Sequence, residues 1–438
     1  MEVPAAAIGQ WNASATGGGG AIDEEGRMKI VLTAILLAAV AARAQDGVTT
    51  LAGLALVSGA TNGMGTNALF NDPAAIAVDA AGNVFVADSQ NDAIREITTN
   101  GVVTTFAGQM GVQGSADGRG TNAQFDAPSG LAFDANGNLL VSDTGNNTIR
   151  EITPAGAVST IAGIAGDVSN VFSAPLGIAV AANGAIFVAD SGNQCIREIF
   201  NGAISTFAGE PQIWGTADGL GANAQFDGPV GLAFDAHGNL FVSDANNDTI
   251  REITPAGDVS TFAGLPGADG AMDGSLQSAR FRSPAELTFD RNGNLFVADS
   301  MNQIIREIGT NGLVQTISGL PGVFGATNGV NGQGRFFNPY GLAFEPDGSL
   351  IVSDTYNEMI RLVTVPFMIA VQQSEGNKLV LSWDSVIGRN YQVQYMTSAD
   401  CAIWSNLDAP VTAACPILVQ TDSIASSSGK IYRVIILQ

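Results

Sequence analysis

Six aspartates are each followed by an arginine seven residues later, and this is the most regular charged pattern in the sequence. The pairs are Asp88 and Arg95, Asp143 and Arg150, Asp190 and Arg197, Asp244 and Arg251, Asp299 and Arg306, and Asp354 and Arg361. A carboxylate and a guanidinium held together could form a ring of acid–base sites. Because the pair recurs in every unit, we favour a structural role, in which the Asp caps a turn and the Arg packs or pairs within the unit.

Other kinds of catalytic chemistry have little support. His237 is the single histidine of the chain, so a zinc site built from three histidines cannot exist. The sequence has no G-x-S-x-G motif for a serine nucleophile. A formal net charge of −23 argues against nucleic acid or an anionic membrane as a partner, since both need basic patches.

The charged pairs lie in repeats, because successive aspartates are 55, 47, 54, 55 and 55 residues apart. In one unit the segments 231–235, 239–244, 249–254 and 258–264 alternate apolar and polar residues, which predicts four strands. The D-A-H-G-N sequence between the first two segments is typical of a tight hairpin. Four antiparallel strands at this period predict one blade of a β-propeller.

The consensus P-x-G-L-A-F-D-x-x-G-N-L-F-V-[AS]-D-x-x-N-x-x-I-R-E-I resembles the NHL repeat, from about Pro73 to Arg361. The resemblance implies an all-β, six-bladed propeller over residues 45–365. Some NHL propellers resemble the peptide-amidating lyase, but the histidine ligands of its zinc are missing here. Residues 48–53 match the last strand of a blade, and the sixth unit lacks that strand. We therefore predict that residues 48–53 close the ring.

We expect any binding site on the face built by the connections between blades, since their sequences differ from blade to blade. The candidates are Trp214, Phe324, Tyr340 and Glu286. The aromatic side chains could contact a ligand or simply pack the loops. Glu286 replaces Gly or Ala of the other units. It could bind a ligand or a divalent cation in the channel, or be a solvated or Arg282-paired carboxylate.

The two ends of the chain differ from the repeats. Residues 28–44 have the pattern of a signal peptide with cleavage after Ala44, and residues 1–27 are interpreted as an over-extended N-terminus. Residues 366–438 resemble a small fibronectin-III-like β-sandwich, of a kind that follows propellers in secreted bacterial proteins. We predict a disulfide between Cys401 and Cys415 in this tail.

The sequence thus predicts a secreted, periplasmic or cell-surface protein with no membrane span, and we expect a monomer. Its predicted role is to bind a protein, a peptide or a glycan, without nucleic acid and without a cofactor. The alternative is a metal-dependent propeller enzyme of lyase or gluconolactonase-like type, with a divalent cation in the channel.

Overall fold

The computed structural model describes residues 47–166, 171–330 and 332–365. In the C-terminal part it describes residues 369–374, 378–384, 390–396, 405–413, 417–423 and 431–437. These residues form β-strands joined by loops and 3₁₀ turns, with no α-helix among them. Within this described part, no helix has the length and apolar character needed to cross a membrane. The predicted signal peptide lies outside the described residues.

The fourth blade shows how one repeat folds. Its elements are β16 (Gly219–Leu220), η6 (Gly221–Asn223), β17 (Pro229–Phe234), β18 (Leu240–Asp244), η7 (Ala245–Asn247), β19 (Thr249–Ile253) and β20 (Asp258–Gly264). Asp235 Oδ1 accepts the N–H groups of His237 and Asn239, both at 2.8 Å, and Gly238 has a φ of 85°, which together form the tight turn between β17 and β18. The strand β18 is buried along its whole length, whereas the outer strand β20 alternates between buried and exposed residues.

The other blades repeat this order. Blade one contains β2 (Gly63–Met64), η1 (Gly65–Asn67), β3 (Pro73–Val78), β4 (Val84–Asp88), η2 (Ser89–Asn91), β5 (Ala93–Ile97) and β6 (Val102–Ala107). Blade two contains β7 (Gly118–Arg119), η3 (Gly120–Asn122), β8 (Pro128–Phe133), β9 (Leu139–Asp143), η4 (Thr144–Asn146), β10 (Thr148–Ile152) and β11 (Ala157–Ala162). Blade three contains β12 (Pro175–Val180), β13 (Ile186–Asp190), η5 (Ser191–Asn193), β14 (Cys195–Phe200) and β15 (Ala203–Ala208).

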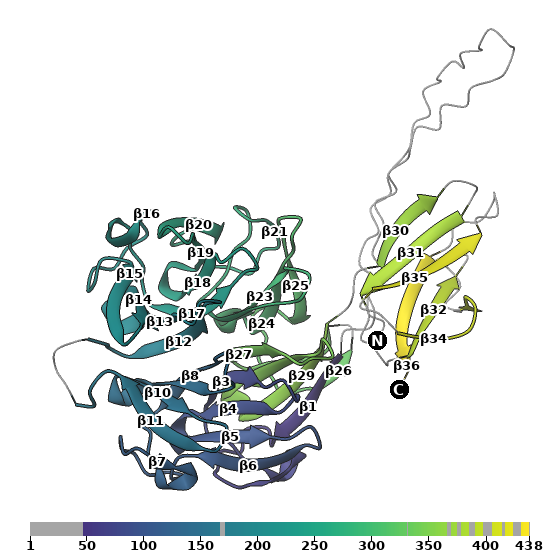
Figure 1. Cartoon of the computed structure of the whole chain (residues 1–438). Coiled ribbons are helices and arrows are strands. Elements are labelled where there is room, and N and C mark those ends of the chain that lie inside the picture. Colours follow the sequence, from purple (N-terminus) through teal and green to yellow (C-terminus); the bar gives the residue numbers. More distant parts are fainter. Residues whose placement is uncertain are drawn as a thin grey trace, which may run out of the picture. The chain divides into compact units, whose positions relative to one another are not determined.

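The last two blades complete the set. Blade five contains β21 (Gly274–Ser275), β22 (Pro284–Phe289), β23 (Leu295–Asp299), η8 (Ser300–Asn302), β24 (Ile304–Ile308) and β25 (Leu313–Gly319). Blade six contains β26 (Gly329–Val330), β27 (Pro339–Phe344), β28 (Leu350–Asp354), η9 (Thr355–Asn357), β29 (Met359–Thr364) and β1 (Gly47–Gly53). Each blade is one antiparallel sheet (Figure 1).

The inner strands of the six sheets form a ring. Each inner strand contacts the inner strand of the next blade, in the order β3, β8, β12, β17, β22, β27 and back to β3. This arrangement confirms the all-β, six-bladed propeller predicted from the repeats. The core lies between adjacent blades. Phe85 of blade one, for example, packs edge-on against Phe133 of blade two, with 5.3 Å between ring centroids.

The sixth sheet combines the two ends of the propeller. Strand β1 pairs antiparallel with β29, from Gly47 opposite Thr364 to Gly53 opposite Met359. The short strand β26 pairs with the other edge of β1. The backbone groups of both edges of β1 are therefore partly paired, and the sixth blade has the same five-stranded order as its neighbours.

Five blades contain one strand more than the predicted four. Part of the connection that enters each of these blades runs along its outer edge and adds a two-residue strand, as β16 does beside β20. These short edge strands were not predicted. The described residues of the third blade form four strands, and the connection that enters this blade is shorter.

The C-terminal part forms two small sheets. One contains β30 (Ile369–Ser374), β31 (Lys378–Asp384) and β35 (Ile417–Ser423), and the other contains β32 (Asn390–Met396), β33 (Ser405–Asn406), β34 (Val411–Thr412) and β36 (Ile431–Leu437). Leu381, Val393 and Leu418 are among its buried residues. Cys401 and Cys415 lie outside the described residues. The likeness to a fibronectin-III domain and the disulfide stay predictions.

Candidate functional site on the connection face

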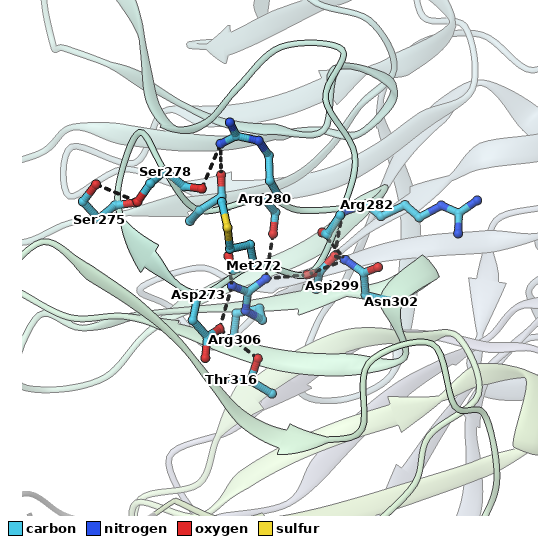
Figure 2. Close-up of polar contacts among 12 residues, drawn as sticks. Met272, Asp273, Ser275, Ser278, Arg280, Arg282, Asp299, Asn302, Arg306 and Thr316 are labelled. Carbon is cyan, nitrogen blue, oxygen red and sulfur yellow. Dashed lines mark hydrogen bonds and ion pairs between the residues drawn. The ribbon is translucent and has the colours of Figure 1, made fainter. Parts of the chain in front are cut away.

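The Asp of each pair is the acceptor at the centre of a buried polar network, shown for blade five in Figure 2. Asp299 Oδ2 accepts Arg306 Nη1 at 2.8 Å and Asn302 Nδ2 at 2.9 Å. Its Oδ1 accepts the backbone N–H of Arg282 at 2.8 Å. The Asp side chain accepts no backbone N–H of the 3₁₀ turn that follows it, so the prediction that it caps this turn was wrong.

The Arg of the pair fastens the incoming connection to its blade. Arg306 Nη1 also donates to Arg280 O at 2.8 Å, and Nη2 donates to Met272 O at 3.0 Å and to Asp273 Oδ1 at 2.9 Å (Figure 2). The guanidinium lies 5.0 Å from the ring centroid of Phe281, at cation–π distance. Arg306 is fully buried. A guanidinium with these partners is fixed in place and closed to a substrate.

Four other blades repeat both halves of this network. The buried ion pairs are Arg95–Asp88 at 2.5 Å, Arg150–Asp143 at 2.6 Å, Arg251–Asp244 at 2.7 Å and Arg361–Asp354 at 2.5 Å. Blade three differs. Arg197 bonds Asp190 through Nε at 2.8 Å and Thr206 through Nη1 at 2.6 Å, and its side chain is 15% exposed. Among the described residues of the connection into this blade, Arg197 bonds no carbonyl group.

A second ring of hydrogen bonds joins each blade to the next. The residue after each D-x-x-N turn is left-handed, with φ between 53° and 64°, and its side-chain oxygen accepts the N–H of the residue before the next inner strand. These acceptor–donor pairs are Asp92–Ala127 (3.1 Å), Asn147–Ala174 (2.8 Å), Gln194–Gly228 (2.6 Å), Asp248–Ser283 (2.8 Å), Gln303–Asn338 (2.6 Å) and Glu358–Asp72 (2.7 Å). We call these contacts the seam latches. The seam latches were not predicted, although every unit has a residue with a side-chain carbonyl or carboxylate after the D-x-x-N turn and a proline at the start of its inner strand.

Two of the candidate residues, Glu286 and Tyr340, lie on neighbouring inner strands. Gly231, the equivalent of Glu286 in β17, lies so close to β22 that an added Cβ would be 2.4 Å from Ala285 O. Glu286 is half-buried, and desolvation raises its carboxyl pKa to about 8, while the N–H groups of Leu287 and Leu232 oppose this shift. Burial and the charge of Glu286 raise the pKa of Tyr340.

The alternative in which Glu286 pairs with Arg282 was wrong. Arg282 Nε lies 3.3 Å from Asp269 Oδ2 instead, and both side chains are more than half exposed. Among the described residues, no three His, Cys, Asp or Glu side chains gather where they could hold a metal ion. Glu286 therefore has the features of a neutral acid or a hydrogen-bonding group rather than of one ligand in a visible set.

Trp214 and Phe324 are the most exposed of the predicted residues, at 71% and 66%. Both are the fifth residue of their connection, counted from Glu210 and from Leu320, so they occupy one position in different blades. Blade five lies between them, and the structure does not bring them together. The two residues therefore mark separate sectors of the connection face.

Phe324 belongs to an exposed aromatic cluster in blade six. Its ring lies 4.9 Å from that of Phe337 at an interplanar angle of 30°, and Phe337 contacts Tyr356 edge-on at 5.2 Å. Tyr356 is 49% exposed. We call these three residues the blade-six aromatic cluster. The roles of Phe337 and Tyr356 were missed, although an alignment of the repeats shows Arg282 and Met301 in their places in blade five.

The opposite face, built by the hairpin turns, contains a shallow hollow of about 380 Å³ between blades two and three. Its rim includes Asp134 of blade two and Ala181 and Gly184 of blade three. Asp134 already accepts hydrogen bonds from its own turn, which hold the pKa of this carboxyl low against desolvation. We therefore favour the connection face.

The repeats and the ring of sheets define the class of this protein. The NHL repeat model matches residues 125–152 and 172–199, within blades two and three, and the other blades repeat the same strands and turns. The chain contains NHL repeats and folds as a six-bladed β-propeller.

Relatives of this chain occur in plants and animals. The chain is 30% identical over 279 residues to Protein SUPPRESSOR OF QUENCHING 1, chloroplastic, of Arabidopsis thaliana, covering 58% of this chain and 26% of the relative. It is 28% identical over 322 residues to NHL repeat-containing protein 2 of Gallus gallus, covering 70% of this chain and 40% of the relative. The chain thus spans well under half the length of these relatives.

A solved structure supports the fold alone. An auxiliary nutrient binding protein from Bacteroides ovatus aligns with a TM-score of 0.57 and 16% identity, covering 74% of this chain and 77% of that one. At this identity the likeness extends to the arrangement of blades and not to any set of ligand-contacting residues.

Proposed function

We propose that this chain is an exported binding protein that recognises a protein, a peptide or a glycan through the connection face of its propeller. The observation that carries the proposal is the exposure of Trp214 and Phe324 at one variable position of a scaffold that is otherwise uniform. Large aromatic side chains lose little conformational entropy on binding and are common anchors in binding sites. The buried networks below them hold the loops in place, so the loops need little ordering when they bind.

The charge of the chain narrows the choice of ligand. A net charge of −23 repels polyanions and favours neutral or cationic ligands. The solved neighbour named as a nutrient binding protein fits a binding role for this fold. Export itself depends on the predicted signal peptide at residues 28–44, and the neighbour from a Bacteroides species is compatible with a location outside the cytoplasm.

The test is a binding screen with matched variants. Purified full-length chain, labelled on its amines, would be applied to arrays of defined peptides and of defined glycans. Each hit would then be measured with Trp214→Ala, Phe324→Ala and the control Phe200→Ala. Phe200 is an aromatic residue, 42% exposed, at the end of β14 next to a hairpin turn.

We expect at least one of the two connection-face variants to weaken each hit by about thirtyfold, the effect of losing one anchor residue. Phe200→Ala should bind as the unmodified chain does, and the melting temperatures of all variants should agree within a few degrees. Hits that depend on Phe200 and ignore both connection-face residues would refute the proposal. A ligand footprint by hydrogen exchange confined to residues 369–437 would refute it as well.

A further inference from the structure

The blade-six aromatic cluster places exposed apolar side chains on the connection face. Phe324, Phe337 and Tyr356 come from two different segments, the connection into blade six and the turn η9. The equivalent side chains of blade five form an ion pair, Asp269 with Arg282. Phe324 and Tyr356 both contact the partly buried ring of Phe337, yet they are 66% and 49% exposed. They leave apolar area in water that an apolar group of a partner could cover.

Carboxylates border this cluster on the side of blade one. Glu358 lies two residues after Tyr356 and forms the seam latch to the N–H of Asp72 at 2.7 Å. Desolvation raises the pKa of Glu358 to about 7, and the charges of Asp72 and Asp88 add to the shift. The N–H of Asp72 opposes this shift, and no cation of the described residues contributes to it. Glu358 and Asp72 therefore repel each other when both are ionised.

The acidic sector continues to the next seam. Asp92 forms the seam latch to Ala127, and burial and the charge of Asp126 raise its pKa. The seam between blades four and five is different, because Arg282 offsets part of the effect of burial on Asp248. The electronegative sector therefore runs from blade six through blade one to blade two, and begins beside the aromatic cluster.

From this juxtaposition we propose that the blade-six aromatic cluster docks an extended basic peptide segment, with an apolar side chain on the rings and an adjacent Lys or Arg over Glu358 and Asp72. This inference rests on the proposed binding role of the connection face and names its partner.

Charge complementarity selects this occupant over a glycan. A bound ammonium or guanidinium group would relieve the repulsion between the two carboxylates, which a neutral sugar cannot do. An acidic or phosphorylated segment would add to that repulsion and is excluded by the same reasoning. An aromatic or aliphatic side chain would use the rings, and an Arg could also stack on the exposed face of Phe324.

The experiment is a selection for peptides by display of random twelve-residue sequences against the full-length chain. We expect the enriched peptides to carry net positive charge and at least one aromatic or large aliphatic residue. Their affinity should fall with rising salt, because exposed charges are screened at high ionic strength. Enrichment of acidic peptides, or of none above background, would overturn the proposal.

Variants then locate the docking site. Phe324→Ala and Tyr356→Ala should each weaken a selected peptide by about ten- to thirtyfold. Asp72→Asn should weaken binding of the peptide by a smaller factor. The substitution should preserve the local structure, because Asn tolerates the left-handed backbone of residue 72 (φ 51°) and keeps the N–H that Glu358 accepts. Phe200→Ala, at the end of β14 next to a hairpin turn, is the control, with affinity expected within about twofold of the unmodified chain.

The outcomes separate this inference from the proposed function. Peptides that depend on Trp214 and ignore Phe324 would overturn the choice of the aromatic cluster while the connection face stays the binding face. Glycan hits that depend on Phe324 and Tyr356 would overturn the choice of a peptide. Protection from hydrogen exchange on the hairpin face alone would overturn both proposals.

Discussion

Replacing Arg251 by methionine should destabilise blade four and release the connection that enters it. The substitution keeps most of the apolar stem and removes a guanidinium that is 1% exposed. That group donates to Asp244 at 2.7 Å, to Gln225 O at 2.9 Å and to Ala217 O at 3.1 Å. The substitution therefore leaves a buried carboxylate and two carbonyl groups without this hydrogen-bond donor.

Removing one partner of a buried ion pair typically costs about 3–5 kcal/mol, because the remaining charge stays desolvated. Asn247 and the N–H of Asp227 still donate to Asp244, which limits the loss, so we expect about 3–4 kcal/mol for Arg251→Met. Arg197→Met in blade three is the matched comparison. Its side chain is 15% exposed and, among the described residues, bonds no carbonyl group of a connection, so we expect roughly half that loss.

The assay is the rate of unfolding in denaturant together with hydrogen exchange. Arg251→Met should speed exchange of the amides that pin the connection, such as those of Gly215 and Gln225, which bond Phe226 O and Ala217 O. Arg197→Met should leave those amides unchanged. Equal unfolding rates for both variants and the unmodified chain, or unchanged exchange in residues 210–228 of Arg251→Met, would refute the reasoning that the Arg fastens the connection.

Four more predictions follow from the sequence and the fold. N-terminal sequencing of exported protein should begin at Gln45, and retention of residues 1–44 would contradict the signal peptide. Non-reducing peptide mapping should find Cys401 linked to Cys415 with buried Cys195 free, and a disulfide that includes Cys195 would be the contrary result. Deleting residues 47–53 should expose the edge of β29 and cause aggregation or a large fall in melting temperature, whereas a monomer with unchanged melting would show that the sixth blade does not need β1. Because the folded pKa of Glu286 is raised from 4.5 to about 8, the unmodified chain should lose stability relative to Glu286→Gln as pH rises across that window. A constant difference in the free energy of unfolding would mean that the carboxyl titrates normally.

The blades could be predicted from the sequence because the features that determine each blade lie within a single repeat. Alternating residues define the strands, and turn chemistry such as Asp235 with Gly238 sets each hairpin, so one repeat contains nearly all the information for one blade. The edge strands such as β16 were missed, since two residues of a loop carry no periodic pattern. Their position depends on the Arg network that draws the connection against the blade.

The candidate site was predictable in part. Exposure of Trp214 and Phe324 followed from non-repeated aromatic residues in surface loops. The contact of Phe324 with Phe337 and Tyr356 could not be deduced, because it joins positions thirteen and thirty-two residues apart through the fold of the turn. The pKa of Glu286 depends on how closely the neighbouring inner strands approach, which the sequence does not specify.

On the connection face, the repeated residues hold the loop backbone in place, and the variable residues form the exposed surface. Outside blade three, each repeated Asp and Arg is buried and holds the backbone of the connection, so the pair sets where the loop lies whatever side chains the loop carries. The side chains of Phe324 and Tyr356 are 66% and 49% exposed, and in blade five the positions of Phe324, Phe337 and Tyr356 hold Asp269, Arg282 and Met301. A substitution there should change what the face binds while leaving the fold intact. The blade-six aromatic cluster is therefore better explained by a partner than by the stability of the propeller, whose other blades are built without it.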